Sequence, residues 1–363
     1  MKNIKHLELF AGIGGFRKAI DLFAKDNSYA STCIGYSEFD NYAELTYESN
    51  FDNNNVVAMG DIVEFNSESS NIKKLNNFNI LTGGFPCQPF SSMGNKKGLK
   101  DSRGNLFYEI VKILKVKNPQ MVLLENVRNF KNHDNGRTFS TVKKILEEEC
   151  GYSVYWDVFN TANFGLPQDR RRVYILGLKT KPSKNFEFTE KIVAETLDEH
   201  IKNTGLNKYK DTRSVLSKNV NEKYYLSNKI KKTILSSGTG GFHAKPEINK
   251  PKARTLTATM VKMHRAGQDN YYSDEFTKLT KAESKKYEDF IVPKSKYNSY
   301  NIRKLTPEEG LKLQGFDKQF FINAHKAGVS NTQLYKQIGN AVSVNVVYGI
   351  IHYLKTKKVS IFK

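Results

Sequence analysis

Short apolar runs alternate with helix-spaced stretches through the first half of the chain. Runs with the length and composition of strands occupy residues 6–10, 32–37, 56–59, 78–81, 119–124, 154–159 and 173–178. Apolar positions recur at helical spacing in residues 17–23, 106–116 and 138–150. Strands that alternate with helices in this way predict an α/β fold built on a doubly wound sheet.

This alternation fades at about residue 182 and stays weak until about residue 301. The segment is rich in lysine, asparagine and tyrosine, so we expect a second, smaller domain or a large insertion. Residues 236–241 and 263–270 within it have the composition of loops. They combine small, basic and amide side chains, which are the types that read the edges of nucleic-acid bases.

The sequence Gly-Gly-Phe-Pro-Cys-Gln-Pro-Phe-Ser follows the run at residues 78–81 and carries Cys87. Its paired glycines allow the backbone to approach a ligand closely, and Pro86 and Pro89 restrict φ on either side of the cysteine. A free cysteine is commonly a small buried hydrophobe, so composition alone favours a packing role. The stiffened turn favours the alternative, a thiol presented to a ligand.

A second glycine-rich turn, Phe-Ala-Gly-Ile-Gly-Gly-Phe at residues 10–16, follows the first predicted strand. Such a turn lets a ligand lie against bare backbone at the start of a helix. Its spacing differs from the GxGxxG pattern, which argues against a dehydrogenase. Glu38, Asp61 and Glu125 each follow a predicted strand. One such acid alone fits a helix cap or a surface charge, whereas two beside the glycine turn favour a nucleoside pocket.

Charge and cysteine content narrow the class of protein. The 363-residue chain has a formal net charge of +20, which favours nucleic acid as a partner, although a lysine-coated surface would give the same charge. Its three cysteines, Cys33, Cys87 and Cys150, are scattered, so we expect neither a disulfide framework nor a metal site. No apolar run approaches the roughly 20 residues that span a bilayer, and Met1 leads directly into a strand. We therefore expect an untargeted, metal-free protein of a reducing cytoplasm.

An ordered series of motifs resembles the C5-cytosine-specific DNA methyltransferases of bacterial type over nearly the full length of the chain. Residues 10–16 are similar to the family's S-adenosylmethionine loop, and residues 84–91 are similar to its nucleophile loop. Residues 125–127, residues 168–172, and residues 303–309 with 313–316 resemble the next three motifs, and residues 337–342 resemble the last. Residues 255–258 resemble a landmark of the family's variable domain, near the DNA backbone.

The resemblance implies a Rossmann-like methyltransferase domain formed by residues 1–185 and 332–363, and a target-recognition domain formed by residues 186–331. It also implies S-adenosylmethionine as the cofactor and S-adenosylhomocysteine as its product. Glu38 would bind the ribose, Asp61 would bind the adenine amine, and Phe39 would stack where the family often has tryptophan. The full set of expected cofactor contacts is Phe10, Ala11, Gly12, Ile13, Gly14, Gly15, Glu38, Phe39, Asp61, Ile62, Pro86, Leu106, Asn340 and Ala341.

The same resemblance assigns the chemistry of methyl transfer to four residues. Cys87 would add as a thiolate to C6 of cytosine, and Glu125 would hydrogen-bond N3 and the exocyclic amine. Arg172 would hold O2, and Arg170 would support the loop or a phosphate. Three consecutive arginines ordinarily form a solvated rim, but a buried strand follows these three, so we expect at least one of them to point into the site.

Double-stranded DNA is the expected partner, because the reacting atoms of a paired cytosine are hidden and the base must flip out of the helix. Residues 91–104 would close over the flipped base. The residues expected to contact DNA are Gln88, Ser91, Arg254, Thr255, His264, Arg265 and Gln268. We expect a monomer of the bacterial cytoplasm or nucleoid, in a restriction-modification system whose cognate endonuclease acts separately.

Two alternatives remain open at this stage. A tRNA cytosine-5 methyltransferase of the same fold would share these motifs, although the long variable segment favours duplex DNA. A catalytically silent DNA-binding regulator is the other alternative, and the presence of Cys87, Glu125 and Arg172 argues against it.

Overall fold

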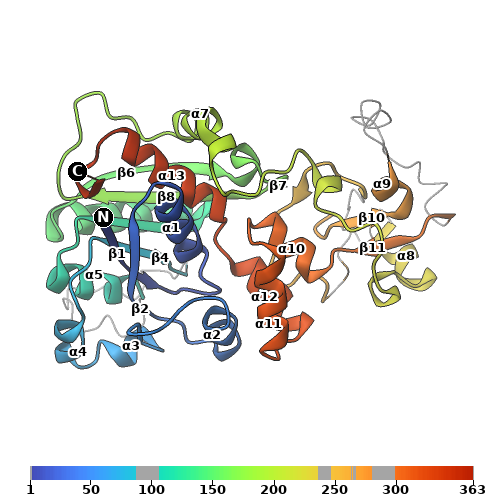
Figure 1. Cartoon of the computed structure of the whole chain (residues 1–363), viewed down its shortest axis with the longest axis horizontal. Coiled ribbons are helices and arrows are strands. Elements are labelled where there is room, and N and C mark those ends of the chain that lie inside the picture. Colours follow the sequence, from blue (N-terminus) through green and yellow to red (C-terminus); the bar gives the residue numbers. More distant parts are fainter. Residues whose placement is uncertain are drawn as a thin grey trace. The chain divides into compact units, whose positions relative to one another are not determined.

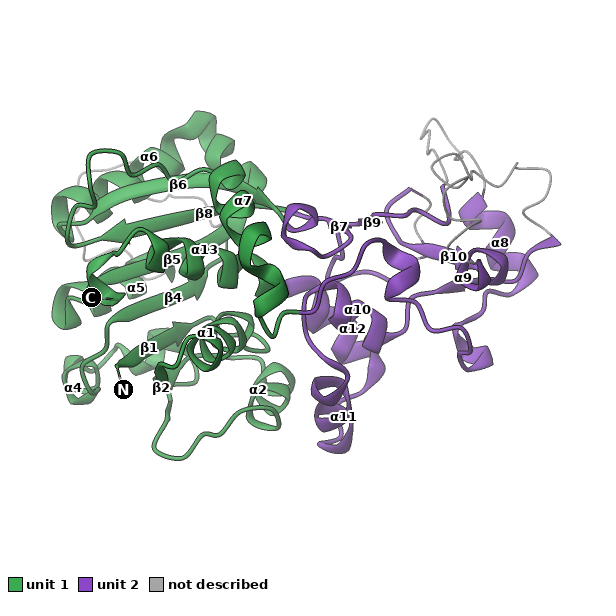
Figure 2. Cartoon of the chain, turned by 45° about the horizontal axis from the view of Figure 1, so that its top comes forward, with its two compact units in different colours: residues 1–160, 171–206, 342–363 green, residues 161–170, 207–341 purple. Residues whose placement is uncertain are grey.

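The computed structural model of the protein describes residues 2–86, 106–235, 247–262, 264, 267–279 and 299–362. The chain divides into two compact units (Figure 2). Unit 1 consists of Met1–Asn160, Arg171–Leu206 and Val342–Lys363, and unit 2 consists of Thr161–Arg170 and Asn207–Ala341. Unit 1 is therefore assembled from three separate stretches of chain. Among the described residues, no helix combines the length and the apolar content needed to cross a membrane.

A seven-stranded sheet with the order β3-β2-β1-β4-β5-β8-β6 forms the centre of unit 1. Its strands are β1 (Asn3–Leu9), β2 (Ala30–Tyr36), β3 (Val57–Ala58), β4 (Ile80–Gly84), β5 (Met121–Val127), β6 (Ser153–Asn160) and β8 (Arg171–Leu178). Strands β1 to β5 run parallel, whereas β8 is antiparallel to both β5 and β6. Because the strand order reverses between β1 and β4, a topological switch point lies there, and ligands bind beyond the carboxyl ends of strands at such points.

Helices cover the sheet of unit 1 on both faces (Figure 1). They are α1 (Gly15–Asp26), α2 (Asn41–Glu48), α3 (Ile62–Phe65), α4 (Ser69–Lys74), α5 (Leu106–Lys117), α6 (Arg137–Lys144), α7 (Glu190–His200) and α13 (Val344–Thr356). On one face α1 packs on α13, where the rings of Phe23 and Tyr348 lie 5.7 Å apart. On the other face, side chains of α3, α5 and α6 join those of the strands in one apolar cluster. The predicted doubly wound α/β fold is confirmed.

The side chains of β1 alternate between an apolar and a polar environment. Leu7 and Leu9 belong to the apolar cluster that contains Phe107 of α5, whereas His6 and Glu8 are buried in a polar environment. This alternation is the ordinary period of a strand, and it places a carboxylate inside unit 1 immediately before the glycine turn.

Unit 2 contains two small sheets and five α-helices among its described residues. Strand β7 (Gln168–Asp169) pairs in parallel with β9 (Ala253–Arg254), and β10 (Tyr271–Ser273) pairs antiparallel with β11 (Ile302–Lys304). The helices are α8 (Asn228–Leu235), α9 (Asp274–Lys278), α10 (Pro307–Leu313), α11 (Lys318–Lys326) and α12 (Asn331–Asn340). A buried ion pair between Arg303 and Glu309, 2.8 Å long, ties β11 to α10. That carboxylate also completes the capping box that starts α10.

Candidate active site and cofactor pocket

The turn after β1 has a backbone conformation that favours glycine. Gly12 and Gly14 have φ angles of +55° and +81°, and a Cβ added to Gly14 would lie 2.3 Å from the Phe51 ring. A Cβ on Gly15 would lie 2.5 Å from the carbonyl oxygen of Val342. The predicted strand, glycine turn and helix are thus present, with bare backbone at the N-terminus of α1.

Glu38 fastens this turn to the end of β2. Its Oε2 accepts a hydrogen bond from the backbone N–H of Gly12 at 2.7 Å. Its Oε1 accepts from the N–H groups of Phe39 and Asp40, at 3.1 and 2.9 Å. Burial raises the pKa of Glu38 above its ordinary value, and these backbone hydrogen bonds oppose that shift. The carboxylate predicted to meet a ribose therefore also shapes the glycine turn.

The other predicted cofactor residues differ in exposure. The ring of Phe39 is 77% exposed, which is unusual for a large apolar side chain and suits a stacking surface. Asp61 is exposed and caps α3 by accepting from the Val63 N–H at 2.8 Å. Ile62 is only 3% exposed and packs in the apolar cluster, so its side chain belongs to the core.

The remaining predicted cofactor contacts in unit 1 lie in the glycine turn, just after β4, or at the start of α5. Ala11 and Ile13 are buried, and Phe10 and Leu106 are half-buried. Pro86 is exposed. Taken with the bare glycine turn and the strand-end carboxylate, these residues fit a nucleoside-containing cofactor such as S-adenosylmethionine.

Glu125 and Arg172 are brought together by the pairing of β5 with β8. Val127 of β5 pairs with Arg172 of β8, and the Arg172 Nε lies 3.0 Å from Glu125 Oε1. Glu125 is 8% exposed, and its Oε2 lies 3.6 Å from the position of a Cβ added to Gly84. The two side chains predicted to hold a cytosine ring are therefore neighbours at the edge of the sheet where β4 ends.

Asn126 ties the end of β5 to the residues that precede the cysteine. Its Nδ2 donates to the carbonyl oxygen of Phe85 at 2.9 Å, and its Oδ1 accepts from the Val127 N–H at 2.8 Å. The Phe85 ring packs 5.3 Å from that of Phe130. Cys87 itself lies outside the described residues, as do Gln88, Ser91 and Arg265. Sequence reasoning missed this positioning role, although Asn126 stands inside the motif at residues 125–127.

The Arg170 guanidinium is 2% exposed and bonds to backbone within unit 2. It donates to the carbonyl oxygens of Leu256, Gly339 and Ala341, at 3.0, 3.1 and 2.9 Å. The two roles predicted for Arg170 were support of the loop and contact with a phosphate, and these hydrogen bonds fit the first role. Asn340, the last residue of α12, is exposed, and Ala341 is buried.

The described DNA-contact candidates are held by contacts inside unit 2. Arg254 pairs with Glu247 at 3.2 Å and donates to two backbone carbonyls, and burial lowers its pKa. Thr255 Oγ1 donates to the carbonyl oxygen of Asp169 at 2.6 Å. His264 Nδ1 lies 3.4 Å from the Tyr271 hydroxyl, and Gln268 is exposed. The geometry therefore gives Arg254 and Thr255 a structural role.

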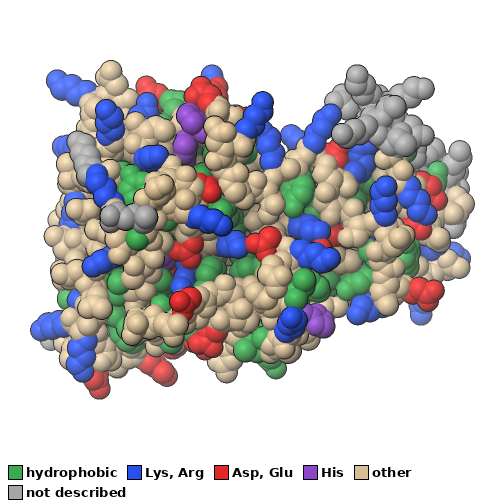
Figure 3. Space-filling model, in the orientation of Figure 1, with side chains coloured by type: hydrophobic (Ala, Val, Ile, Leu, Met, Phe, Trp, Pro, Cys, Tyr) green, Lys and Arg blue, Asp and Glu red, His purple; other side chains and the backbone are tan. Residues whose placement is uncertain are grey.

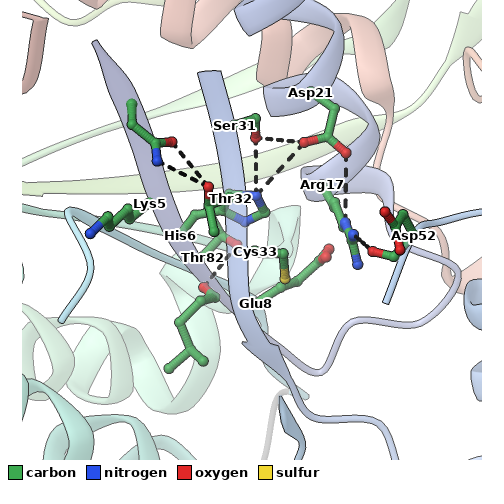
Figure 4. Close-up of polar contacts among 12 residues, drawn as sticks. Lys5, His6, Glu8, Arg17, Asp21, Ser31, Thr32, Cys33, Asp52 and Thr82 are labelled. Carbon is green, nitrogen blue, oxygen red and sulfur yellow. Dashed lines mark hydrogen bonds and ion pairs between the residues drawn. The ribbon is translucent and has the colours of Figure 1, made fainter. Parts of the chain in front are cut away.

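A buried polar network near the glycine turn could not be anticipated from the sequence. Arg17 of α1 donates to the Tyr47 hydroxyl and to Asn53 Oδ1, at 3.2 and 2.8 Å. It also donates to the backbone oxygen of Asp52, a contact that Figure 4 shows. Tyr47 in turn donates to Glu8 Oε2 at 3.3 Å. Burial raises the pKa of Glu8 to about 8 although Arg17 opposes the shift. The network joins β1, α1 and α2 around the predicted cofactor turn.

Metal ligands do not gather in the described ranges, where no group of three or more His, Cys, Asp or Glu side chains could hold an ion.

Comparison with known proteins gives full-length similarities. A family model described as "C-5 cytosine-specific DNA methylase" matches residues 4–356. The type II methyltransferase M1.ScrFI of Lactococcus lactis subsp. cremoris is 35% identical over 95% of this chain and 76% of its own length. M.HpaII of Haemophilus parainfluenzae is 34% identical over 94% of this chain and 86% of its own. M.HhaI of Haemophilus parahaemolyticus is 30% identical over 97% and 94%.

Solved structures resemble the fold at lower identity. The Entamoeba histolytica methyltransferase EhMeth superposes with a TM-score of 0.71 and 21% identity, covering 98% of this chain and 99% of that one. The S. pombe Dnmt2 methyltransferase superposes with a TM-score of 0.67 and 19% identity, covering 97% and 98%. These likenesses support the fold.

Proposed function

Because the chain belongs to the C-5 cytosine-specific DNA methylase family, we propose that Cys87 is the nucleophile with which it methylates cytosine in duplex DNA. The activity is that of a DNA (cytosine-5-)-methyltransferase, and the methyl donor is S-adenosylmethionine. The observation that carries the residue assignment is the Glu125–Arg172 pair. The pair lies beside Asn126, which donates a hydrogen bond to the carbonyl oxygen of Phe85, two residues before Cys87.

The chemistry of C5 requires a nucleophile at C6. The Cys87 thiolate forms a bond to C6, the ring electrons move toward C5 and N3, and N3 takes a proton from Glu125. Bound S-adenosylmethionine supplies the methyl group that C5 accepts. Removal of the C5 proton by a base restores the ring, breaks the bond between Cys87 and C6, and returns the N3 proton to Glu125. General-acid help of this kind is worth about 10²- to 10⁴-fold in rate.

Arg172 has a double role in this scheme. Its guanidinium can donate to O2 of the flipped cytosine, and without the base its Nε lies 3.0 Å from Glu125. Arg170 acts indirectly, because it fixes the backbone around Leu256 and Ala341. It is therefore a positioning residue in this proposal and not a group that touches substrate.

The cofactor would be held where the glycine turn, Glu38 and Phe39 meet the carboxyl ends of the central strands. Glu38 would accept hydrogen bonds from the ribose, and the exposed Phe39 ring would stack on the adenine. Asp61 would accept from the adenine amine, with one of its oxygens already fixed by the cap of α3. Ile62, being buried, would contribute packing beneath the adenine site.

Unit 2, which consists of Thr161–Arg170 and Asn207–Ala341, is proposed to choose the DNA sequence, the role that the resemblance implies for residues 186–331. Several relatives are named type II methyltransferases, which supports a place for this chain in a restriction-modification system. We propose that it acts there as a monomer, separately from its cognate endonuclease, in the bacterial cytoplasm or nucleoid.

Trapping with 5-fluorocytosine tests the nucleophile. A duplex with 5-fluorocytosine at the methylated position should form a denaturation-resistant adduct with the wild-type protein when S-adenosylmethionine is present, and Cys87→Ala should form none. Bisulfite sequencing of DNA from cells that express the chain supplies the position. An adduct that survives Cys87→Ala would refute the assignment of the nucleophile.

Assays of methyl transfer to tRNA and to duplex DNA, together with DNA binding, separate the two alternatives. Methyl transfer to tRNA in preference to duplex DNA would identify the RNA-modifying alternative. DNA binding by the wild-type protein without any methyl transfer would identify the silent regulator.

A further inference from the structure

A pocket of about 350 Å³ in unit 2 is lined by lysines from three separate segments. Lys223 lies in the 3₁₀ turn Glu222–Tyr224, Lys262 follows the stretch at residues 255–260, and Lys304 ends β11. The other described lining residues are small, apolar or uncharged: Tyr224, Ala258, Met260, Val261, Asn331, Thr332 and Tyr335. Lysines that are distant in sequence thus converge on one cavity.

Two of the three lysines that line this pocket, Lys223 and Lys304, repel each other. Lys304 is half-buried, and burial, followed by the charge of Lys223, lowers its pKa. Within the described residues, no carboxylate forms an ion pair with any of the three lysines. The buried acid Glu309 is committed elsewhere, since it binds Arg303 at 2.8 Å and the Thr306 N–H at 2.8 Å. An anion in the pocket would relieve this repulsion.

Lysine by itself is a weak sign of a binding site on this protein. Lys and Arg side chains are scattered over the face shown in Figure 3, as the net charge of +20 requires. The pocket differs because its ammonium groups surround a cavity with an aromatic and aliphatic lining. Lys223 Nζ lies 5.5 Å from the centre of the Tyr224 ring, and Met260 is only 6% exposed. Such a lining suits a sugar attached to a phosphate better than a free ion.

One of the residues expected to contact DNA lies near the pocket. The charge of Lys304 lowers the pKa of His264, after burial as the larger cause, so the DNA-reading candidate His264 lies within electrostatic reach of the pocket. Asn331 and Thr332 begin α12, so the positive end of that helix adds to the field.

We propose that this pocket, with Lys223, Lys262 and Lys304 as donors, binds a backbone phosphate of the DNA substrate. The inference rests on the proposed function, because it takes duplex DNA as the ligand. A contact of this kind positions the duplex on unit 2 and carries no sequence information itself. Sequence would be read by other residues of the unit.

The test measures DNA affinity against salt for the full-length protein. Lys304→Gln is compared with Lys318→Gln, which removes an equal charge from an exposed site on α11 that does not line the pocket. The double variant with Lys223→Gln is compared with Lys304→Gln. Each lost phosphate contact should weaken binding of a duplex by about 3- to 10-fold and reduce the slope of log K against log salt by about 1. Lys304→Arg should restore most of the affinity. Binding of S-adenosylmethionine by the same variants checks that they are folded.

Three results would overturn the proposal. In the first, the pocket variants lose no more DNA affinity than Lys318→Gln does. In the second, the salt slopes of the pocket variants match that of the wild type. In the third, inorganic phosphate stabilises the wild type but not Lys304→Gln, and the DNA affinity of Lys304→Gln stays unchanged. The last result would assign the pocket to a free anion. Failure of the proposed function is distinct, because the wild-type protein would then transfer no methyl group to DNA at all.

Discussion

Arg172 Nε lies 3.0 Å from Glu125 Oε1, so the two side chains assigned to N3 and O2 of the target base contact each other. A guanidinium stabilises the ionised form of a carboxyl group, whereas the proposed mechanism needs Glu125 to give a proton to N3. An entering cytosine must therefore compete with this ion pair. Binding of the base and activation of the acid become one event.

Glu125→Gln should reduce turnover by about 10²- to 10⁴-fold while DNA binding persists, because an amide keeps the shape of the side chain but cannot transfer a proton. Single-turnover methylation and anisotropy measure the two effects. Glu109→Gln is the matched control, since Glu109 is another buried acid of unit 1, bound to Lys112 at 2.8 Å, and it should retain turnover. Equal loss of binding and turnover in Glu125→Gln would indicate a structural role.

Asn126→Asp should slow adduct formation by Cys87, because it replaces the donor to Phe85 with a second acceptor and leaves that buried carbonyl without its bond. A cost of about 1–3 kcal/mol corresponds to roughly 5- to 150-fold. The rate of adduct formation with a 5-fluorocytosine duplex is the measurement. Asn66→Asp removes comparable bonds to Glu109, away from the cysteine loop. If both variants slow the adduct equally, the effect is general destabilisation.

Gly14→Ala should destabilise the protein more than Gly60→Ala. Both residues have positive φ, +81° and +56°, but an added Cβ meets the Phe51 ring only at Gly14, and nothing lies within 4 Å at Gly60. The backbone term alone costs about 1–2 kcal/mol. Chemical denaturation measures the difference, and calorimetry should show weaker S-adenosylmethionine binding in Gly14→Ala. Equal stabilities would mean that Phe51 moves away without cost.

The buried Glu8 predicts a loss of stability as pH rises. Its folded pKa is about 8 against an ordinary 4.5, so between these values the unfolded state loses a proton that the folded state keeps. Each pH unit in this window lowers the free energy of unfolding by up to about 1.4 kcal/mol. Glu8→Gln should remove that slope, measured by denaturation at pH 5 and pH 8, and the exposed Glu64→Gln should not. Parallel profiles for Glu8→Gln and the wild type would contradict the prediction.

The sequence predicted the sheet well where apolar runs are long and less well elsewhere. The run at residues 119–124 has the character of a buried parallel strand and corresponds to β5, Met121–Val127, which is parallel to β4. An apolar run cannot tell that the same strand also pairs antiparallel with β8. Strands β7 and β9 have two residues each and give no periodic signal. The helix expected at residues 138–150 ends in a π-helical turn, Ile145–Glu149.

The three adjacent arginines show what a residue type and its place beside a strand can and cannot predict about the site. Of the three adjacent arginines, Arg172 meets Glu125 and Arg170 holds backbone, and Arg171 is exposed. The network of Glu8, Arg17 and Tyr47 could not be predicted, because its members come from three elements and each alone resembles a surface or core residue.

The packing of α1 on α13 has a consequence for synthesis. Tyr348 of α13 donates to Asp26 at the end of α1 across a sequence separation of 322 residues. At 5–20 residues per second, α1 leaves the ribosome roughly 15–65 s before its partner. During that interval the ring of Phe23, fully buried in the finished fold, lacks its contacts with Tyr348 and His352. Unit 1 can therefore close only after unit 2 has been made.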